Sequence, residues 1–174
     1  HLDTRLPIQV TVRKRGSGME VDFTGSAPQA PGPINVNYYT SCSAAYWAIR
    51  SVFAPDAPTN EGAHRPITVT IPEGCLFNPH PNAPTALRAQ SVKAASIAVL
   101  GALARIAPDR VMAAPGGTIN VYSLGGRSPE RGASFGCTDL IANGWGGRPG
   151  KDGVDDLTSD GDNCRIVAAE ALEA

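Results

Sequence analysis

Residues 6–24 read LPIQVTVRKRGSGMEVDFT, and this stretch decides the kind of fold to expect. Apolar and polar side chains alternate from Leu6 to Val12 and again from Met19 to Phe23. A repeat of two residues is typical of a strand with one buried face. The intervening RKRGSG supplies a turn. The stretch therefore predicts an antiparallel β-hairpin.

The rest of the chain adds helices and further strands to this hairpin. Residues 44–53 carry an apolar face at helical spacing, which Thr40–Ser43 are expected to cap. A second helix is predicted from 89 to 106, and short strands are predicted at 67–71 and 119–122. This order favours an α+β domain with a mixed or antiparallel sheet, two main helices and long Gly/Pro-rich loops.

Length and composition limit the classes of protein to consider. The chain has 174 residues, which suits a single domain spanning 1–174. Its 19 glycines and 15 prolines imply many turns and ordered loops. The formal net charge of −1 predicts no nucleic acid partner, and no apolar run reaches the ~20 residues of a membrane span. Because the chain opens on His1 and not on methionine, we expect a fragment, a processed chain or the ordered portion of something longer.

The cysteines point to a reducing compartment. None forms a C-x-x-C pair, and no histidine lies at ligand spacing from any of them. The chain also lacks a secretory hydrophobic region. We therefore expect buried free thiols in a cytoplasmic protein, and no zinc site, at the four cysteines: Cys42, Cys75, Cys137 and Cys164.

No nucleotide-binding motif is present. The chain has no G-x-x-x-x-G-K-[ST], and GWGG at 144–147 is followed by Pro149 and Gly150 where a helix would have to begin. A structural turn or close backbone packing is the favoured interpretation of this glycine run. We therefore predict no cofactor-binding residue and no metal ligand in this chain.

Five polar residues are the candidate catalytic groups. Asn60 is followed by Glu61, His64 and Arg65, which place a carboxylate, an imidazole and a guanidinium within five residues, where they could orient a substrate or donate protons. They could equally cap a helix and satisfy loop carbonyls, and this interpretation is favoured. Asp152 opens an acidic stretch whose spacing does not match a calcium loop, so a solvated loop is favoured there. Asn120 is the remaining candidate.

Seven short strings carry a resemblance to a known family. They are VDFTGS at 21–26, GPINV at 32–36, NEG at 60–62, RPI at 65–67, PEGCLFNP at 72–79, GGTIN at 116–120 and GWGGRPGKDG at 144–153. Each string alone is weak. Their shared order and spacing resemble the hydantoinase B/oxoprolinase family, in the later, C-terminal part of a hydantoinase B-type subunit.

The resemblance implies a role in a multi-subunit, ATP-dependent enzyme. The expected partners are a hydantoinase A-type ATP-binding subunit, the remaining hydantoinase B-type segment and a small-molecule substrate, in a hetero-oligomer. The implied reaction is the opening of a cyclic amide such as hydantoin, 5-oxoproline or a lactam. The alternatives are a subunit of an acetone or acetophenone carboxylase and a non-catalytic structural module.

The same resemblance locates the cofactors elsewhere. ATP and a divalent metal are expected in the whole complex, but the family's metal-binding motif lies in an earlier segment, so no ligand is carried over to this chain. The chain is therefore expected to shape a substrate pocket or an interface and to be inactive alone. Its sequence also departs from the family pattern at 159–163, where the family tends to read histidine-methionine-threonine-asparagine.

Overall fold

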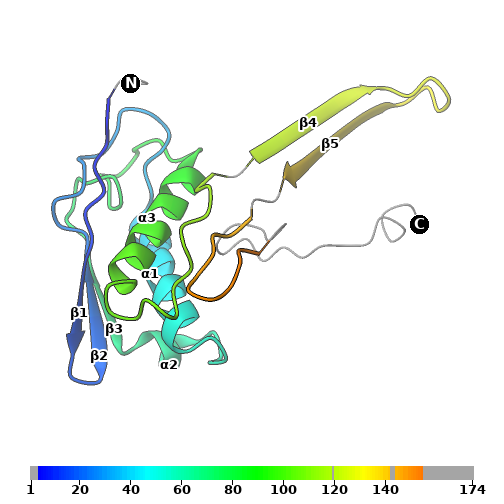
Figure 1. The fold of residues 1–174 in the computed structure, drawn as a ribbon. Coiled ribbons are helices and arrows are strands. Elements are labelled where there is room, and N and C mark those ends of the chain that lie inside the picture. Colours follow the sequence, from blue (N-terminus) through cyan, green and yellow to red (C-terminus); the bar gives the residue numbers. More distant parts are fainter. Residues whose placement is uncertain (1–3, 119, 142–143, 155–174) are drawn as a thin grey trace.

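The computed structural model describes residues 4–118, 120–141 and 144–154 (Figure 1). Its first sheet has the order β1-β2-β3, with β1 at Thr11–Arg15, β2 at Gly18–Asp22 and β3 at Ile67–Thr70. β1 and β2 are antiparallel, whereas β3 runs parallel to β2. The sheet is therefore mixed, and the predicted α+β class is confirmed.

The predicted hairpin forms, but its first strand is shifted along the chain. Arg15 pairs with Gly18, so the turn consists of Gly16 and Ser17 alone. Gly16 has a φ of +56°, the left-handed conformation that two-residue hairpin turns use. The predicted strand start at Leu6 is wrong, because the main chain there bonds to another partner. The Pro7 carbonyl accepts a hydrogen bond from the Ala27 amide at 2.8 Å.

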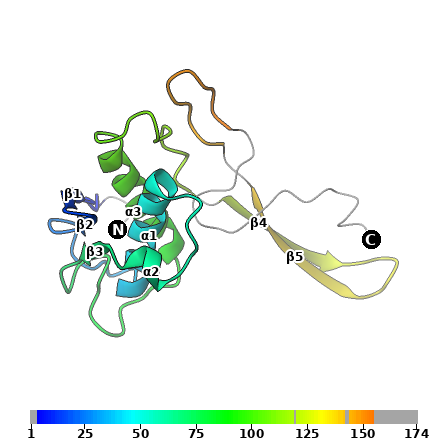
Figure 2. The same ribbon diagram turned by 90° about the horizontal axis from the view of Figure 1, so that it is seen from below.

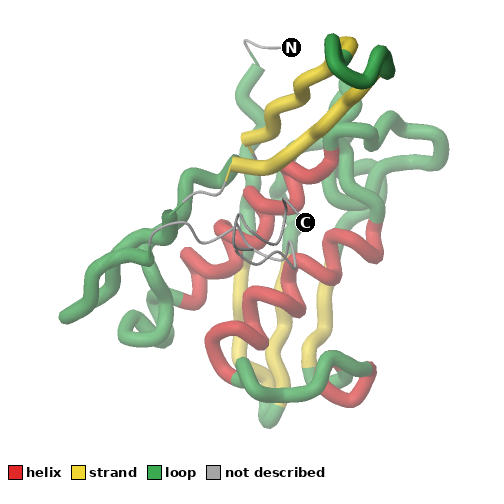
Figure 3. The backbone as a smooth tube through the Cα atoms, turned by 90° about the vertical axis from the view of Figure 1, so that its right-hand side faces the viewer, coloured by secondary structure: helices red, strands yellow, loops and turns green. Residues whose placement is uncertain are grey.

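Two long helices lie side by side against one face of this sheet (Figures 1, 2 and 3). They are α1 at Tyr38–Phe53 and α3 at Arg88–Leu103, and a single turn, α2 at Glu61–His64, precedes β3. α1 begins before the predicted residue 44, because the Asn37 side chain accepts a hydrogen bond from the Thr40 amide and so caps the helix. The predicted cap at 40–43 is therefore wrong.

The core fills the space between the sheet and the helices. The rings of Phe23 and Phe77 are both fully buried, with their centroids 5.2 Å apart. Small side chains bring the two helices and the sheet close together. The other residues with no exposed surface in this core are Val21, Val36, Ala45, Ala48, Ala95, Val99 and Leu103.

Buried polar side chains hold the proline-rich loops that follow β2 and β3. Asn35 is fully buried: its oxygen accepts a hydrogen bond from the Ala30 amide at 2.7 Å, and its nitrogen donates to the carbonyls of Ala30, Gly32 and Pro84 at 2.8, 3.1 and 3.0 Å. Ser41 donates to the Phe77 carbonyl at 2.7 Å. Proline has no amide hydrogen and cannot donate a main-chain hydrogen bond. In these loops the side chains of Asn35 and Ser41 therefore bond to main-chain groups that a regular sheet would have paired.

A second, separate sheet consists of only two strands. β4 at Asn120–Arg127 and β5 at Ser134–Ile141 form an antiparallel hairpin that extends away from the helices (Figure 1). Of the predicted strand at 119–122, residue 119 lies outside the described residues, and 120–122 are the start of a longer strand. β5 was not predicted. Glycines at 125, 126 and 136 interrupt the alternation of side chains that would have indicated these strands.

The glycine run at 144–153 folds through close backbone contacts, as predicted. Trp145 and Val154 form a β-bridge, and so do Arg148 and Lys151. A Cβ atom on Gly153 would lie 2.2 Å from the Trp145 carbonyl oxygen, so no other residue fits there without a shift. The acidic stretch beyond Asp152, the helix-competent tail at 166–174 and Cys164 lie outside the described residues.

Two further predictions concern the burial of the cysteine thiols and the lack of a membrane span. Cys42 and Cys75 are free and buried as expected, whereas Cys137 is free and exposed, so the expectation of burial is wrong there. Cys137 is exposed because it lies on the projecting hairpin and not in the core. Within the described part of the chain, no helix is both long enough and apolar enough to cross a membrane.

Candidate functional site

The predicted residues Asn60, Glu61 and His64 come together around the single turn of α2. The Asn60 side chain accepts a hydrogen bond from the Ala63 amide at 3.2 Å and caps this turn. Glu61 occupies the first turn and is exposed to solvent. A capping amide followed by a carboxylate is the arrangement that the exposed amides of a helix start favour. These contacts support the structural interpretation, and a catalytic role remains a prediction.

His64 is held by an aromatic partner. Its ring stacks on that of Tyr46, with the centroids 4.6 Å apart and the planes 8° from parallel. Burial raises the pKa of Tyr46, and the nearby Cys42 and Glu61 raise it further. Burial also raises the pKa of the Cys42 thiol, so this sulfur is protonated at neutral pH and is a poor nucleophile. The cluster therefore fixes an imidazole in place without an activated nucleophile beside it.

The other two candidates, Asn120 and Asp152, lie outside the α2 turn. Asn120 begins β4, and Asp152 is an exposed residue of the 144–154 loop. The structure therefore brings together three of the five predicted residues. Among the described residues, no group of three or more histidine, cysteine, aspartate and glutamate side chains could hold a metal ion.

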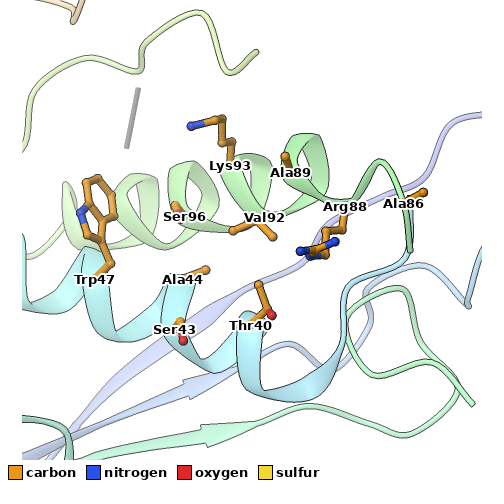
Figure 4. Close-up of a pocket in the computed structure, with 10 residues that line it drawn as sticks. All are labelled: Thr40, Ser43, Ala44, Trp47, Ala86, Arg88, Ala89, Val92, Lys93 and Ser96. Carbon is orange, nitrogen blue, oxygen red and sulfur yellow. The ribbon is translucent and has the colours of Figure 1, made fainter. Parts of the chain in front are cut away.

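Sequence reasoning missed a groove between α1 and α3, shown in Figure 4. The groove has a volume of about 580 Å³. Trp47 lies at one end and Arg88 at the other (Figure 4). The side chains between them are mostly small or aliphatic, which leaves the space open. They are Thr40, Ser43, Ala44, Ala89, Val92, Lys93 and Ser96, with Ala86 two residues before the start of α3.

The polar groups of the groove are suited to binding. The Arg88 guanidinium is turned toward Thr40 of α1 (Figure 4). The Thr40 hydroxyl donates a hydrogen bond to the Asn37 side chain at 2.8 Å, and the Ser43 hydroxyl donates to the Tyr39 carbonyl at 3.0 Å. Neither hydroxyl proton is directed at a general base, so neither oxygen is activated for attack. The groove offers guanidinium donors and hydroxyl acceptors above an apolar floor.

The 144–154 loop packs beside this groove through a second indole. The rings of Trp145 and Trp47 have centroids 6.1 Å apart. The Ala113 amide donates to the Gly147 carbonyl at 2.9 Å, which holds the loop against the chain that follows α3. The loop thus buttresses Trp47 from the side. Both helices and one glycine loop therefore contribute to the same surface.

Comparisons of sequence place these features in a family. The model of the family described as hydantoinase B/oxoprolinase matches residues 1–174. A putative D-/L-hydantoinase B-type subunit from Pseudomonas sp. (strain NS671) is 35% identical over 176 residues, which cover 97% of this chain and 29% of that protein. The 5-oxoprolinase PfmaA of Pestalotiopsis fici is 29% identical over 98% of this chain and 13% of its own length.

Comparisons of structure agree with those of sequence. The ATP-dependent caprolactamase of Pseudomonas jessenii matches with a TM-score of 0.74 and 28% identity, covering 87% of this chain and 27% of that one. A nucleotide-free acetone carboxylase matches with a TM-score of 0.69 and 20% identity, over 92% of this chain and 22% of that one, which shows the fold alone. The chain spans less than a third of each of these relatives. It belongs to the hydantoinase B/oxoprolinase family.

Proposed function

We propose that the chain is a late segment of the B-type subunit of an ATP-dependent enzyme that opens cyclic amides. The observation that carries this proposal is the likeness, across 97% of the chain, to a hydantoinase B-type subunit. The likeness to an ATP-dependent caprolactamase supports the same class of substrate, because a lactam and a hydantoin are both cyclic amides. Hydantoin, 5-oxoproline and a lactam are the substrates to test first.

The contribution of this segment is a surface, with the reactive groups supplied elsewhere in the complex. The groove between α1 and α3 combines a guanidinium with hydroxyls and an indole, and the described residues provide no metal-ligand cluster. Guanidinium and hydroxyl groups can hold an amide or a carboxylate in place. ATP and a divalent metal belong to the whole complex in this proposal, with no ligand assigned to this chain.

The proposed partners are a hydantoinase A-type ATP-binding subunit and the remaining hydantoinase B-type segment. This chain matches 29% of the length of the Pseudomonas hydantoinase protein but only 13% of the length of the 5-oxoprolinase PfmaA. That 5-oxoprolinase is therefore more than twice as long as the hydantoinase protein. Its single polypeptide is long enough to contain the equivalents of both subunits. Supply of ATP and the free buried thiols Cys42 and Cys75 both favour the cytoplasm as the site of the complex.

Ketone carboxylation is the less supported reaction. The likeness to acetone carboxylase has 20% identity and extends to the fold only. The more similar relatives carry names of cyclic-amide enzymes. A purely structural module is the remaining alternative, and it differs in predicting that the groove residues tolerate substitution.

Reconstitution of the complex tests the proposal. The B-type subunit, with and without this segment, is mixed with the A-type subunit, and ATP hydrolysis is followed in the presence of hydantoin, 5-oxoproline or caprolactam. We expect amide-dependent ATP hydrolysis only when the segment is present. Hydrolysis driven by acetophenone and bicarbonate, but by no amide, would assign the carboxylase reaction instead. No dependence on the segment would refute the proposal.

Substitutions separate a pocket from a structural module. Arg88→Ala is expected to lower kcat/KM by at least ~10-fold with folding preserved, because it removes donors from the groove. Arg105→Ala changes an exposed arginine just after the end of α3, outside the groove, and is the matched control that is expected to leave turnover nearly unchanged. A loss of more than ~100-fold on His64→Ala or Asp152→Ala would instead assign those residues to catalysis. Unchanged turnover in Arg88→Ala would favour the structural module.

A further inference from the structure

The β4–β5 hairpin has two chemically different faces. On one side of the hairpin, Asp139 of β5 pairs with Tyr122 of β4 near the end away from the turn. Tyr122 and Leu124 lie on the same face as Phe135 and Cys137, because Leu124 pairs with Cys137 and Gly126 pairs with Phe135. We call these four residues the apolar hairpin face. The Phe135 ring lies over Gly126, where a Cβ atom would be 3.2 Å from Cε1 of the ring. The face is thus continuous across both strands.

The opposite face is mainly polar or small. The Ser123 and Thr138 hydroxyls, which form a cross-strand pair, are 2.9 Å apart and hydrogen-bonded. Gly125 pairs with Gly136 on the same side, and Val121 pairs with Leu140 at the end away from the turn. This division of side chains is the pattern of a strand pair with one face covered and one face in water.

The apolar hairpin face is nevertheless exposed in this structure. Tyr122, Leu124 and Phe135 are 41%, 58% and 54% exposed. The sheet to which they belong contains β4 and β5 alone. Two strands without a covering layer are marginally stable in water. The face is therefore shaped for another layer of protein.

The area of the apolar hairpin face limits which protein could cover it. Strands of eight residues make a face about 27 Å long and about 10 Å wide, or about 270 Å² on each side of an interface. Two such faces packed together bury far less than the ~1,000 Å² that a stable, specific interface needs. A second copy held through this face alone would therefore dissociate. The occupant must be held close by a covalent link or by other contacts.

In two relatives of this chain, the matching segment is joined covalently to a much longer stretch of polypeptide. The segment accounts for 29% of the hydantoinase B-type subunit and 27% of the caprolactamase chain. More than two thirds of each of those chains is therefore joined covalently to the equivalent of this hairpin. A covalent link raises the effective concentration into the millimolar range, so a small apolar contact suffices.

We propose that the apolar hairpin face docks on an apolar surface of the remaining B-type polypeptide, an inference that rests on the proposed function. The hairpin is then an arm that joins two parts of one subunit. Leu124 and Cys137 lie at the centre of the contact, and the Ser123–Thr138 face remains toward solvent. An acidic side chain introduced on the apolar face would be buried without a partner, whereas one on the opposite face would stay hydrated.

Alkylation of Cys137 tests this docking in the full-length B-type subunit. Its rate of reaction with N-ethylmaleimide is measured by peptide mass spectrometry and compared with that of a peptide of residues 134–141. We expect Cys137 to react at least ~20-fold more slowly in the subunit. Leu124→Asp is expected to restore at least half of the peptide's rate, while the matched variant Ser123→Asp keeps the protection. Cys42 and Cys75, which are buried, must stay unreactive in both variants. This control shows that the sheet β1–β3 and its two long helices remain folded.

Other outcomes would overturn the proposal. Alkylation at the peptide's rate would show that nothing covers the face. Protection that disappears on ~100-fold dilution would assign the contact to a second copy, and protection that appears only with the A-type subunit would assign it to that subunit. The labelling needs no turnover. Protection in a subunit without amide-dependent ATP hydrolysis would therefore keep the docking and reject the proposed reaction.

Discussion

Two parts of the molecule place the same kind of side chain in opposite surroundings. One is the body, which consists of β1, β2 and β3 with the helices α1 and α3, and the other is the β4–β5 hairpin. Phe23, at the end of β2, is fully buried and packs against Phe77. Phe135, at the start of β5, is 54% exposed and contacts Gly126 across the strand pair. The body has a helical layer over its sheet, whereas the hairpin is a single layer. An apolar strand residue therefore stabilises this chain only where a second layer covers it.

The largest expected effect compares these two phenylalanines directly. Phe23→Ala is expected to lower the free energy of unfolding by about 3–5 kcal/mol, because it leaves a cavity in the packed core. In the 174-residue chain by itself, Phe135→Ala is expected to change it by less than about 0.5 kcal/mol, because a side chain that is half exposed there loses little burial. Urea denaturation followed by circular dichroism measures both. Equal losses would mean that the hairpin is covered in solution and would end the comparison.

The second effect concerns the polar interior of the body. Asn35→Ala is expected to cost about 2–4 kcal/mol, because the main-chain groups of Ala30, Gly32 and Pro84 lose their buried partner. The matched change on the hairpin is Ser123→Ala, which removes one exposed hydrogen bond and is expected to cost less than about 0.5 kcal/mol. The midpoint of urea denaturation reports both. A similar midpoint for the two variants would contradict the assigned role of Asn35.

Local patterns predicted the parts of the fold that local physics determines. The alternation at Met19–Phe23 and at Ile67–Ile71 indicated two neighbouring strands, and the apolar spacing after residue 89 indicated α3. The start of β1 could not be read from its alternation, because residues 6–10 alternate equally well. What differs there is the partner: Pro7 and Gln9 bond to residues of the 24–27 loop, a contact between segments far apart in the sequence.

The candidate site shows the same limit. Asn60, Glu61 and His64 were predicted because they are neighbours in sequence, and they are neighbours in space. The groove was not predicted, because its two walls come from residues 40–47 and 86–96, which only the packing of α1 on α3 brings together. Trp47 falls within residues 44–53, for which the sequence predicted a helix with an apolar face. Its half-buried position at the end of the groove depends on Trp145, nearly a hundred residues later.

The third effect tests how α1 begins. Asn37→Ala is expected to cost about 1 kcal/mol, because the Asn37 side chain accepts hydrogen bonds from both the amide and the hydroxyl of Thr40. Asn37→Asp is the conservative control and is expected to keep most of the stability, since a carboxylate also accepts from these donors and favours a helix start. Thermal unfolding measures both variants. A loss in Asn37→Asp as large as in Asn37→Ala would show that the cap is not what stabilises this end of α1.

The smallest expected effect on stability depends on pH. It compares a carboxylate of the β1–β2 hairpin, Asp22, with one of the β4–β5 hairpin, Glu130. Hydrogen bonds from Thr24, assisted by Arg13, hold the pKa of Asp22 below its usual value. A lowered folded pKa adds stability above the unfolded pKa of about 3.9, and that stability is lost as the pH falls through the folded value. The Asp22 side chain is 20% exposed, so solvent screening limits the gain to about 0.5–1 kcal/mol.

Asp22→Asn is therefore expected to be less stable than the wild type at pH 6, and the difference is expected to shrink at pH 3. Glu130→Gln, in the exposed turn between β4 and β5, is the matched control and is expected to follow the wild type at both values. The measurement is the free energy of unfolding in urea at each pH. A difference that persists at pH 3 would show that Asp22 acts through packing, since the carboxylate charge that Arg13 and the Thr24 amide stabilise would by then be diminishing.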